Sequence, residues 1–347
     1  MSQIGITMPM LNTSLQETAA LARFAEDGGF DSVWGYEFYR TAYMGLAAAA
    51  QQTSRIKLGT GLSVALTRTP FVTANTAADV DELSGGRTLL GIGTGSPEFL
   101  HHFHGISNER PLARMRDYVG AVRASWHYLD TEDPTTYDGT EHRLDFPEFM
   151  PFGTRPLVRP SIPIYLAGER PKMIQLAGEI ADGLLGAFYS VKYLTEVVHP
   201  NLAIGAERAG RDPATIDIAS EIVCAVHPDR DIAMRRARIQ VGMYAAHPVG
   251  DAIVARNGLE KEQQEVREAL LLGGAEALEA TTSPRLIEAL SISGTPDECR
   301  DQYREYAAVL PHVLFHTPYV PPLASDESQD AFRQIVDCFR RTGGSGT

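Results

Sequence analysis

The chain has 347 residues, with 31 lysines and arginines against 44 aspartates and glutamates, so its formal net charge is −13. This acidic balance argues against a protein that binds nucleic acid or anionic membranes, because such a protein needs a basic surface to meet phosphate. Hydrophobic residues make up 44% and charged residues 22%, as in a soluble globular protein, and the length allows two ordinary domains or one large α/β barrel.

Cysteine usage and the N-terminus indicate the compartment. Cys224, Cys299 and Cys338 lie far apart and form no CxxC pair, which is typical of reduced thiols in an intracellular protein. The opening MSQIGITMPM lacks a basic segment followed by a long apolar one, so no signal peptide is expected. The most apolar stretch, residues 44–50, is shorter than the roughly 18 residues that a membrane span requires. We therefore expect a cytoplasmic protein without a membrane segment.

From its beginning the chain alternates between short apolar runs and helical patterns. Ser14 followed by Glu17 forms the capping-box pattern that starts a helix, and Gly28-Gly29 ends it. Pro70 is well placed to open a later helix. Strands are expected over Ile4–Met8, Asp31–Tyr36, Ile56–Gly61 and Thr88–Ile92. The helices after them are expected from Ser14 to Gly28, over 41–52, from Pro70 to Leu83 and from Pro111 to Leu129.

The alternation breaks over 130–160, which is rich in Pro, Asp, Thr and Gly and contains a small β excursion at Tyr137–Phe146. Four further strands are then expected over Ile162–Ala167, Gly183–Phe188, Thr215–Val226 and Val313–Phe315. Helices are expected over Pro171–Ile180, 191–210 and Asp229–Tyr244, and from Thr295-Pro296 onward. A polar helical segment occupies 247–290, and the closing GGSGT has the composition of a flexible tail.

Eight strand–helix alternations predict an α/β fold, a (β/α)8 TIM barrel, because repeated βα units form a parallel sheet and eight of them favour closure. We expect a single barrel domain over 1–325, with insertion segments at about 130–160 and 247–290. A C-terminal helix and flexible tail are expected over 326–347. The 247–290 insertion is a candidate lid. Barrels bind ligands at the C-terminal ends of their strands, so the candidate site residues are sought there.

The fourth strand leads into a glycine-rich run, Gly91–Ser96. A P-loop would require Lys-Ser or Lys-Thr after the glycines, and a Rossmann fingerprint would require glycine at Ser96 with a helix directly after it. Pro97-Glu98 and a polar, His-rich loop are expected here instead. The run excludes both nucleotide motifs and predicts a tight turn where the backbone approaches a neighbour closely.

The fifth strand is followed by a second candidate, Ala167–Met173. Gly168 permits close approach, a helix begins at Pro171, and Arg170 and Lys172 supply two cations beside it. Free backbone N–H groups and the positive end of a helix form a natural phosphate site. An ordinary βα turn is the alternative interpretation.

His101, His102 and His104 place three imidazoles within a short stretch, which raises the question of a metal site. Adjacent histidines in a loop seldom converge on one ion, and no carboxylate or cysteine spacing completes a ligand set. We therefore expect no metal. Substrate contact, proton transfer and a solvated loop remain open for these histidines.

Glu37, at the end of the second strand, is a carboxylate on the expected catalytic face. It is either a functional group or a structural rim residue paired with Arg40 or Arg68. The aromatic residues around it could line a planar ligand, although half of the side chains on a strand should belong to the core.

Several short motifs follow one another in a fixed order. They are GFDSVW at 29–34, LGTG at 58–61, TRTP at 67–70, DELSGGR at 81–87, GIGTG at 91–95, PKM at 171–173, AGEIADG at 177–183 and GTP at 294–296. In this order they resemble the bacterial luciferase-like monooxygenase superfamily. The resemblance extends over about residues 1–320, and the block 58–95 is highly specific. It supports the barrel independently of the strand pattern.

That superfamily uses FMN or the deazaflavin coenzyme F420, and the block looks most like the F420-dependent branch. The resemblance implies a non-proline cis peptide at Gly61-Leu62, beneath the cofactor ring. It implies that the ring or ribityl side is lined by Gly93, Thr94 and Gly95. It implies that the cofactor phosphate is held by Gly168, Glu169, Arg170 and the helix that starts at Pro171. Because the chain is acidic as a whole, we expect the attraction for an anionic cofactor to be local and to come from Arg68, Arg170 and Lys172 near the strand ends.

One position departs from this pattern. The dehydrogenases of that branch typically read Asp-His at the end of the second strand, where the histidine is the catalytic base, and this chain reads Glu37-Phe38. Phe38 cannot transfer a proton. The resemblance therefore favours an F420-dependent oxidoreductase that reduces a C=C or C=N bond of a small organic substrate. Glu37, His101 or His102 would supply the proton.

An FMN-dependent monooxygenase that uses O2, with a separate reductase supplying reduced flavin, is the alternative. A flavin-binding protein without catalysis is a lesser one. A flavin-free barrel isomerase or aldolase would need a catalytic lysine at a strand end, and none stands out. Relatives commonly dimerise, so a homodimer is expected. The rim loops determine the substrate and leave its identity open.

Overall fold

The computed structural model describes residues 2–9, 13–148, 153 and 155–341. Eight parallel strands form a barrel: β1 (Gln3–Thr7), β2 (Ser32–Gly35), β3 (Lys57–Thr60), β5 (Thr88–Gly93), β8 (Ile164–Ala167), β9 (Gly183–Ala187), β10 (Asp217–Val226) and β12 (His312–His316). Strand β12 pairs with both β1 and β10, which closes the sheet. The predicted TIM barrel is confirmed. Each predicted strand is present, with ends shifted by one or two residues.

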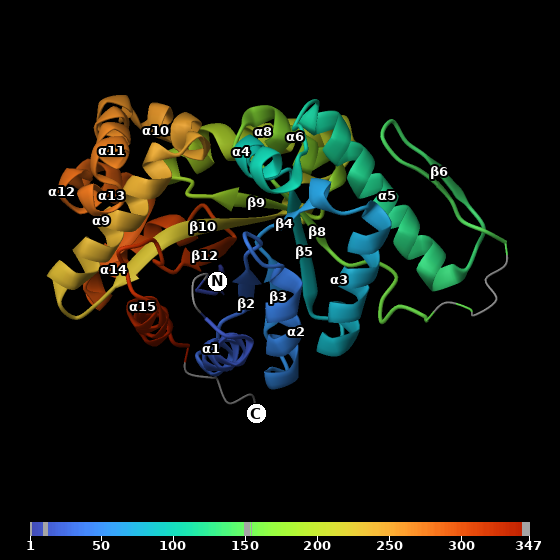
Figure 1. Cartoon of the computed structure of the whole chain (residues 1–347), viewed down its shortest axis with the longest axis horizontal. Coiled ribbons are helices and arrows are strands. Elements are labelled where there is room, and N and C mark those ends of the chain that lie inside the picture. Colours follow the sequence, from blue (N-terminus) through green and yellow to red (C-terminus); the bar gives the residue numbers. More distant parts are fainter. Residues whose placement is uncertain (1, 10–12, 149–152, 154, 342–347) are drawn as a thin grey trace.

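Helices cover the outside of the barrel (Figure 1). They are α1 (Leu15–Asp27), α2 (Ala42–Gln52), α3 (Pro70–Ser84), α5 (Pro111–Thr131), α6 (Pro171–Ile180), α8 (His199–Arg208), α9 (Arg230–Ala246) and α14 (Pro296–Ala307). Their ends follow the local sequence. The Ser14 N–H donates to Glu17 Oε2 at 2.8 Å, which completes the predicted capping box of α1. Gly85, with φ of 67°, ends α3 in the left-handed conformation that glycine adopts without strain.

Two strands lie outside the predicted set. Strand β4 (Ser63–Val64) pairs with β5, and β11 (Ser291–Gly294) pairs with the far end of β10. The predicted helix over 191–210 is α7 (Val191–Tyr193), a π-helical turn (Leu194–Val198) and α8. Short 3-10 turns occupy Ala65–Thr67, Pro213–Thr215 and Pro248–Gly250.

The prediction of a polar, His-rich loop after Gly91–Ser96 is wrong, because the chain is helical there. Ser96 Oγ accepts a hydrogen bond from the Phe99 N–H at 3.1 Å and caps α4 (Pro97–Phe99). This helix continues as a π-helical turn, Leu100–His104. A helix therefore does begin directly after the glycine run, although Ser96 still stands where the dinucleotide fingerprint requires glycine.

The insertions lie on opposite sides of the barrel in Figure 1. A hairpin of β6 (Thr136–Asp138) and β7 (Arg143–Asp145) lies beside α5. Four helices gather beside α9, namely α10 (Asp251–Asn257), α11 (Glu260–Gly273), α12 (Glu276–Thr281) and α13 (Pro284–Leu290). The chain continues into α15 (Ser325–Cys338), and the predicted flexible tail at 342–347 lies outside the described residues. Within the described part of the chain, no helix combines the length and apolar character needed to cross a membrane.

Side chains fill the inside of the barrel. The interior cluster consists of Trp34, Leu89, Tyr165, Leu185, Ala219 and Leu314, with Leu62 and Ala167 packed against it. A Cβ on Gly59 would lie 2.4 Å from the Trp34 ring, so only glycine lets the indole occupy the centre. At the N-terminal end, Ser32 Oγ bonds both the Trp34 indole N–H and His312 Nε2 at 2.8 Å. A ligand therefore cannot enter the barrel and must bind above this packed core.

Candidate active site

The floor of the candidate site consists of small residues around Leu62, at the C-terminal ends of three strands. The Gly61-Leu62 peptide, directly after β3, is cis, as the resemblance implied. A Cβ on Gly93 would lie 2.9 Å from both Leu62 Cδ2 and Ala167 Cβ. The ends of β3, β5 and β8 therefore meet here. Of the expected cofactor-binding residues, the structure brings Gly61, Leu62 and Gly93 together.

Thr94 and Gly95 continue from the end of β5 as a tight turn. Gly95 has a φ of +77°, and a Cβ there would lie 2.9 Å from Val64 Cγ1. Its carbonyl accepts a hydrogen bond from Thr94 Oγ1 at 3.2 Å. Glycine at position 95 thus satisfies both the backbone conformation and the close approach to β4.

The start of α6 carries two cations without partners. Arg170 precedes the helix, and Pro171 is its first residue. Arg170, Pro171 and Lys172 are all exposed. Among the described residues, neither Arg170 nor Lys172 forms an ion pair. Gly168, just before them, is fixed because its N–H donates to the Leu185 carbonyl at 3.1 Å and its carbonyl accepts the Tyr189 hydroxyl. A rigid turn with free positive charge at a helix start suits an anion.

Glu169 lies between these groups and is half-buried. Burial, together with the nearby charge of Glu221, raises the pKa of the Glu169 carboxyl to about 7. The Tyr193 hydroxyl donates to the Glu169 carbonyl at 2.6 Å and holds its backbone. Near neutral pH this carboxyl therefore carries only part of a negative charge beside Arg170 and Lys172.

Glu37 and Arg68 form an ion pair at the rim. Arg68 Nη1 lies 2.6 Å from Glu37 Oε1, and the side chains are 21% and 7% exposed, respectively. Ser63 Oγ also donates to Glu37 at 3.4 Å, and the Arg68 guanidinium lies 5.6 Å from the centre of the Tyr43 ring. Of the two possible partners of Glu37, Arg40 and Arg68, the structure shows Arg68 as the one that pairs with it. Two of the expected site residues therefore bind each other.

The three clustered histidines lie on the π-helical turn and are exposed. The rings of His101 and His102 lie 5.2 Å apart, edge to face. Neither imidazole has a hydrogen-bond or ion-pair partner in the residues that the structure describes, while the His101 backbone carbonyl accepts a hydrogen bond from the Gly105 N–H at 3.2 Å. Over the described ranges, no group of three or more His, Cys, Asp or Glu side chains is arranged to hold a metal ion.

An aromatic rim lies beside these histidines. It consists of Phe38, Tyr39, Phe99 and Phe103. Phe38 stacks on Phe99 with ring centres 5.4 Å apart, and Tyr39 contacts Phe103 at 5.5 Å. Phe38, Tyr39 and Phe103 are 42%, 67% and 56% exposed. Phe38, at the position where the dehydrogenases that this sequence resembles read histidine, therefore belongs to an exposed apolar surface.

A buried polar cluster connects the C-terminal ends of β2 and β12 with β10. Tyr36 follows β2, Glu221 lies within β10, and His316 ends β12. The Tyr36 hydroxyl contacts His316 Nδ1 and donates to Glu221 Oε2 at 3.3 Å, while His316 Nδ1 lies 3.1 Å from the same oxygen. Burial, reinforced by Glu221, raises the pKa of the Tyr36 phenol well above its usual value. Gln240, on α9, contacts His316 Nε2 at 3.0 Å.

Reasoning from the sequence missed Glu221, His316 and Gln240. One local signal was present, because Glu221 is a single carboxylate inside the apolar run of β10, IASEIVCAV. A buried charge in a strand requires a partner, which would have pointed to a second polar residue at a neighbouring strand end. His316 lies 95 residues further along the chain, and no motif links the two.

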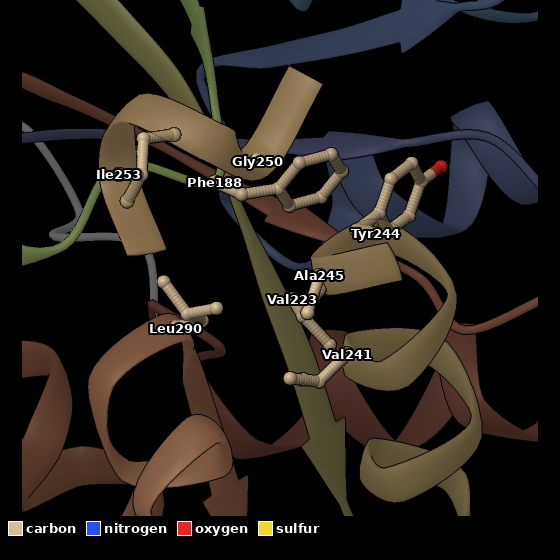
Figure 2. Close-up of a pocket in the computed structure, with 8 residues that line it drawn as sticks. All are labelled: Phe188, Val223, Val241, Tyr244, Ala245, Gly250, Ile253 and Leu290. Atoms are coloured by element: carbon tan, nitrogen blue, oxygen red, sulfur yellow. The ribbon is translucent and has the colours of Figure 1, made fainter. Parts of the chain in front are cut away.

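Phe188 and Tyr244 pack against His316, with ring centres 5.1 and 5.3 Å from the imidazole, and Figure 2 shows their two rings side by side. Their rings stack at 3.8 Å, and Phe188 has a φ of +60° while its N–H donates to the Glu221 carbonyl at 2.7 Å. The cavity drawn in Figure 2 lies against these rings and measures about 10 Å³. Its lining is apolar, with Val223, Val241 and Ile253 among its members. It is a packing void of about one water in size and cannot hold a ligand.

Comparison with known proteins relates this site to a family. Residues 2–312 match the family model described as luciferase-like monooxygenase. The 5,10-methylenetetrahydromethanopterin reductase of Methanolobus tindarius is 33% identical over 294 residues, which cover 83% of this chain and 85% of that protein. A putative coenzyme F420-dependent oxidoreductase of Mycobacterium tuberculosis is 34% identical over 66% of this chain and 68% of that protein.

A solved structure agrees with these sequence matches. The coenzyme F420-dependent tetrahydromethanopterin reductase of Methanopyrus kandleri superposes with a TM-score of 0.83 and 26% identity. The match covers 96% of this chain and 97% of that one. The similarity therefore includes the whole barrel as well as the motif block.

Proposed function

The chain belongs to the luciferase-like monooxygenase family, and from this premise we propose that it is an F420-dependent oxidoreductase. When bound, the reduced coenzyme supplies a hydride, here to a C=C or C=N bond of a small organic substrate. Two relatives whose names specify coenzyme F420 support this cofactor over FMN. The protein's own task is to bind, orient and shield the reactants.

The residues at the mouth suit such a cofactor through the small side chains of the floor and the positive charge at the start of α6. The observation that carries the proposal is the continuous segment from Ala167 to Lys172. Ala167 packs on the floor beside Gly93, and a few residues later Arg170 and Lys172 supply cations that form no ion pair within the described part of the chain. The segment from Ala167 to Lys172 would thus contact both the cofactor ring above Leu62 and the anionic tail at the start of α6.

Individual roles follow from this arrangement. Gly61 and Leu62 would lie under the ring, and Gly93, Thr94 and Gly95 along its ring or ribityl side. Gly168, Glu169, Arg170, Pro171 and Lys172 would hold the phosphate. Arg68 would add positive charge only in part, because Glu37 neutralises it across 2.6 Å.

Phe38 bears on the direction of the reaction. A phenyl ring cannot accept the proton of an alcohol, so reduction suits this mouth better than alcohol oxidation. Glu37, His101 and His102 are the proposed proton sources. Glu37 would have to leave its ion pair with Arg68, whereas the histidines already face solvent.

The aromatic rim supports a planar substrate. Phe38, Tyr39 and Phe103 expose ring surface beside the floor, and exposed aromatic rings bind flat organic molecules by stacking. The substrate class that suits this surface is a conjugated or heteroaromatic small molecule that presents the reducible bond.

The second candidate is an FMN-dependent monooxygenase that uses O2, which the description of the matching family supports. A separate reductase would then supply reduced flavin. A homodimer is part of both proposals, and sedimentation of the purified protein measures it directly.

The test is a side-by-side equilibrium titration with oxidised F420 and with FMN. We expect F420 to bind at least about tenfold more tightly, a difference of roughly 1.4 kcal/mol. The double variant R170A/K172A should weaken F420 binding by at least about tenfold, because two charge-assisted contacts are lost. The matched control R143A removes a cation from the β7 hairpin and should leave the affinity unchanged.

Other outcomes select other functions. Tighter FMN binding together with oxygen uptake in the presence of reduced FMN would favour the monooxygenase. Binding of either cofactor without turnover over a broad substrate panel would indicate a binding protein. If neither cofactor binds at micromolar concentration, the proposed function is wrong.

A further inference from the structure

We propose that Glu221 is the acid–base carboxylate of this barrel, positioned by Tyr36 and His316, with Gln240 selecting the tautomer of His316. The inference rests on the proposed reduction and places its proton donor at this buried carboxylate, in place of the rim residues Glu37, His101 and His102. Glu221 is 6% exposed, lies in the middle of β10, and belongs to none of the motifs shared with the family.

The two oxygens of Glu221 have different surroundings. Oε2 is held by the Tyr36 hydroxyl at 3.3 Å and by His316 Nδ1 at 3.1 Å. Oε1 lies on the side of Gly61, where a Cβ would come within 3.3 Å of it. One oxygen is therefore fixed by the protein and the other points to the floor on which the ring is proposed to lie.

Gln240 determines which nitrogen of His316 carries the proton. Its Oε1 accepts hydrogen bonds from the backbone N–H groups of Tyr319 and Val320 at 2.9 and 3.1 Å. Its NH2 group must then face His316 Nε2, at 3.0 Å. An amide NH2 can only donate, so Nε2 accepts and the proton of the neutral ring lies on Nδ1.

The Nδ1–H tautomer completes a chain of orienting contacts. Backbone N–H groups hold Gln240, and Gln240 holds His316. The His316 Nδ1–H then points to the Tyr36 hydroxyl oxygen and to Glu221 Oε2, while the Tyr36 hydroxyl donates its own proton to Glu221 Oε2. Such a chain keeps a carboxyl group in one rotamer, which is how positioned acid–base groups gain their efficiency. Tyr36, His316 and Gln240 are thus positioning residues, because they act through Glu221.

The proposed proton step balances with the hydride of the reduced coenzyme. The hydride forms a C–H bond at one atom of the C=C or C=N bond and carries two electrons to it, so that the coenzyme is oxidised and the substrate reduced. Glu221, a carboxylate in the resting site, first takes a proton from water onto Oε1; this O–H bond then breaks, and its proton forms the new bond at the other atom. The carboxylate that remains keeps both donors on Oε2, and water returns the proton.

Several ionisable groups face Glu221 from the elements around it. They are Tyr36 after β2, Glu169 after β8, Tyr244 on α9, and His316 and Tyr319 at and after the end of β12. Glu169 is the second carboxyl in this set. Any pH profile of the reaction must therefore be compared with that of the E169Q variant.

The first test uses the cofactor-free protein. Long-range 1H–15N spectra of 15N-histidine-labelled protein report the tautomer of each ring, and H316Q identifies the signals of His316. We expect the Nδ1–H tautomer in the wild type. In Q240E the new carboxylate accepts from Nε2, so the tautomer should change to Nε2–H or the ring should become protonated. A wild-type His316 with its proton on Nε2 would overturn the positioning scheme.

The second test separates binding from chemistry. E221Q should keep its cofactor affinity within about threefold and lose about 100-fold or more in kcat, as for removal of a general acid. E221D should recover part of the rate, and the exposed E207Q serves as the control with unchanged turnover. Turnover of E221Q within threefold of the wild type would refute the role of Glu221.

The outcomes also separate this inference from the proposed function. Should E221Q fail to fold, Q240E carries the same test, with turnover expected to fall by about tenfold at unchanged cofactor affinity. Wild-type protein that binds F420 and reduces substrate, but is insensitive to both variants, would contradict only the inference. Wild-type protein that binds neither cofactor would contradict the proposed function, while the histidine spectra would still report the arrangement of His316.

Discussion

The ion pair of Glu37 with Arg68 shows how one side chain can have a structural and a chemical interpretation. We predict that R68A lowers the free energy of unfolding by about 2–4 kcal/mol, because it leaves the 7% exposed Glu37 carboxylate without its partner. Urea denaturation measures the change. The double variant E37Q/R68A should lose less than R68A alone, since it removes the uncompensated charge. A loss below about 0.5 kcal/mol in R68A would mean that the pair contributes little to stability.

The Glu169 carboxyl, beside the proposed anion site, makes the stability of the protein depend on pH. Burial and the charge of Glu221 raise its carboxyl pKa from 4.5 to about 7, so the folded protein binds this proton more tightly than the unfolded chain. Its contribution to stability is therefore most favourable below pH 4.5 and is lost as the pH rises toward 7. E169Q should be more stable than the wild type at pH 8, by about 1–3 kcal/mol, and similar to it at pH 4.5. Denaturation curves of both proteins at the two pH values test this, and a difference independent of pH would contradict it.

Part of the site could be predicted from single residues. Gly61, Leu62 and Gly93 belong to the motif block 58–95, so the sequence alone identified them as candidate site residues. Glu221 could not be found in this way, because its partner Tyr36 lies 185 residues away in the chain and the contact exists only once the barrel closes.

At the scale of elements, the β6–β7 hairpin is attached to α5 by close contacts. A Cβ on Gly139 would lie 1.7 Å from Asp117 Oδ1, and His142 Nδ1 lies 2.5 Å from Asp117 Oδ2. We predict that G139A detaches the hairpin and costs about 1–3 kcal/mol, because the methyl group must displace a buried carboxylate. Hydrogen exchange over residues 135–146 should accelerate in this variant.

The control for this prediction is a glycine with ordinary space around it. A Cβ on Gly45, in α2, would meet Thr18 Cγ2 at 3.4 Å, which is a normal contact. G45A should be neutral or stabilising by up to about 1 kcal/mol, because alanine is the better helix former. If G139A behaves like G45A, the hairpin is not held through this contact.

The strands of the barrel were predictable because most contain a short apolar run, as expected for a parallel sheet covered on both faces. Strand β4 was not, since two residues carry no periodicity, and the sequence of β11, SISG, is too short and polar to indicate a strand. The π-helical turn at Leu100–His104 was also missed, because its three histidines have the composition of a loop.

For the whole molecule, the net charge of −13 excludes a general attraction for anions and leaves room for a local one. Arg170 and Lys172 supply that local charge at the start of α6, on the same face as the small residues of the floor. The global charge thus constrains the class of partner, while the barrel determines where an anionic cofactor can bind.

The account depends most on where the cofactor binds, and a crystal structure of the protein with oxidised F420 measures this directly. We predict density for the ring against Gly61 and Leu62, with a Glu221 carboxylate oxygen facing it, and density for the phosphate at Arg170 and Lys172. Ring density outside the mouth of the barrel, or an anionic tail away from the start of α6, would contradict the account.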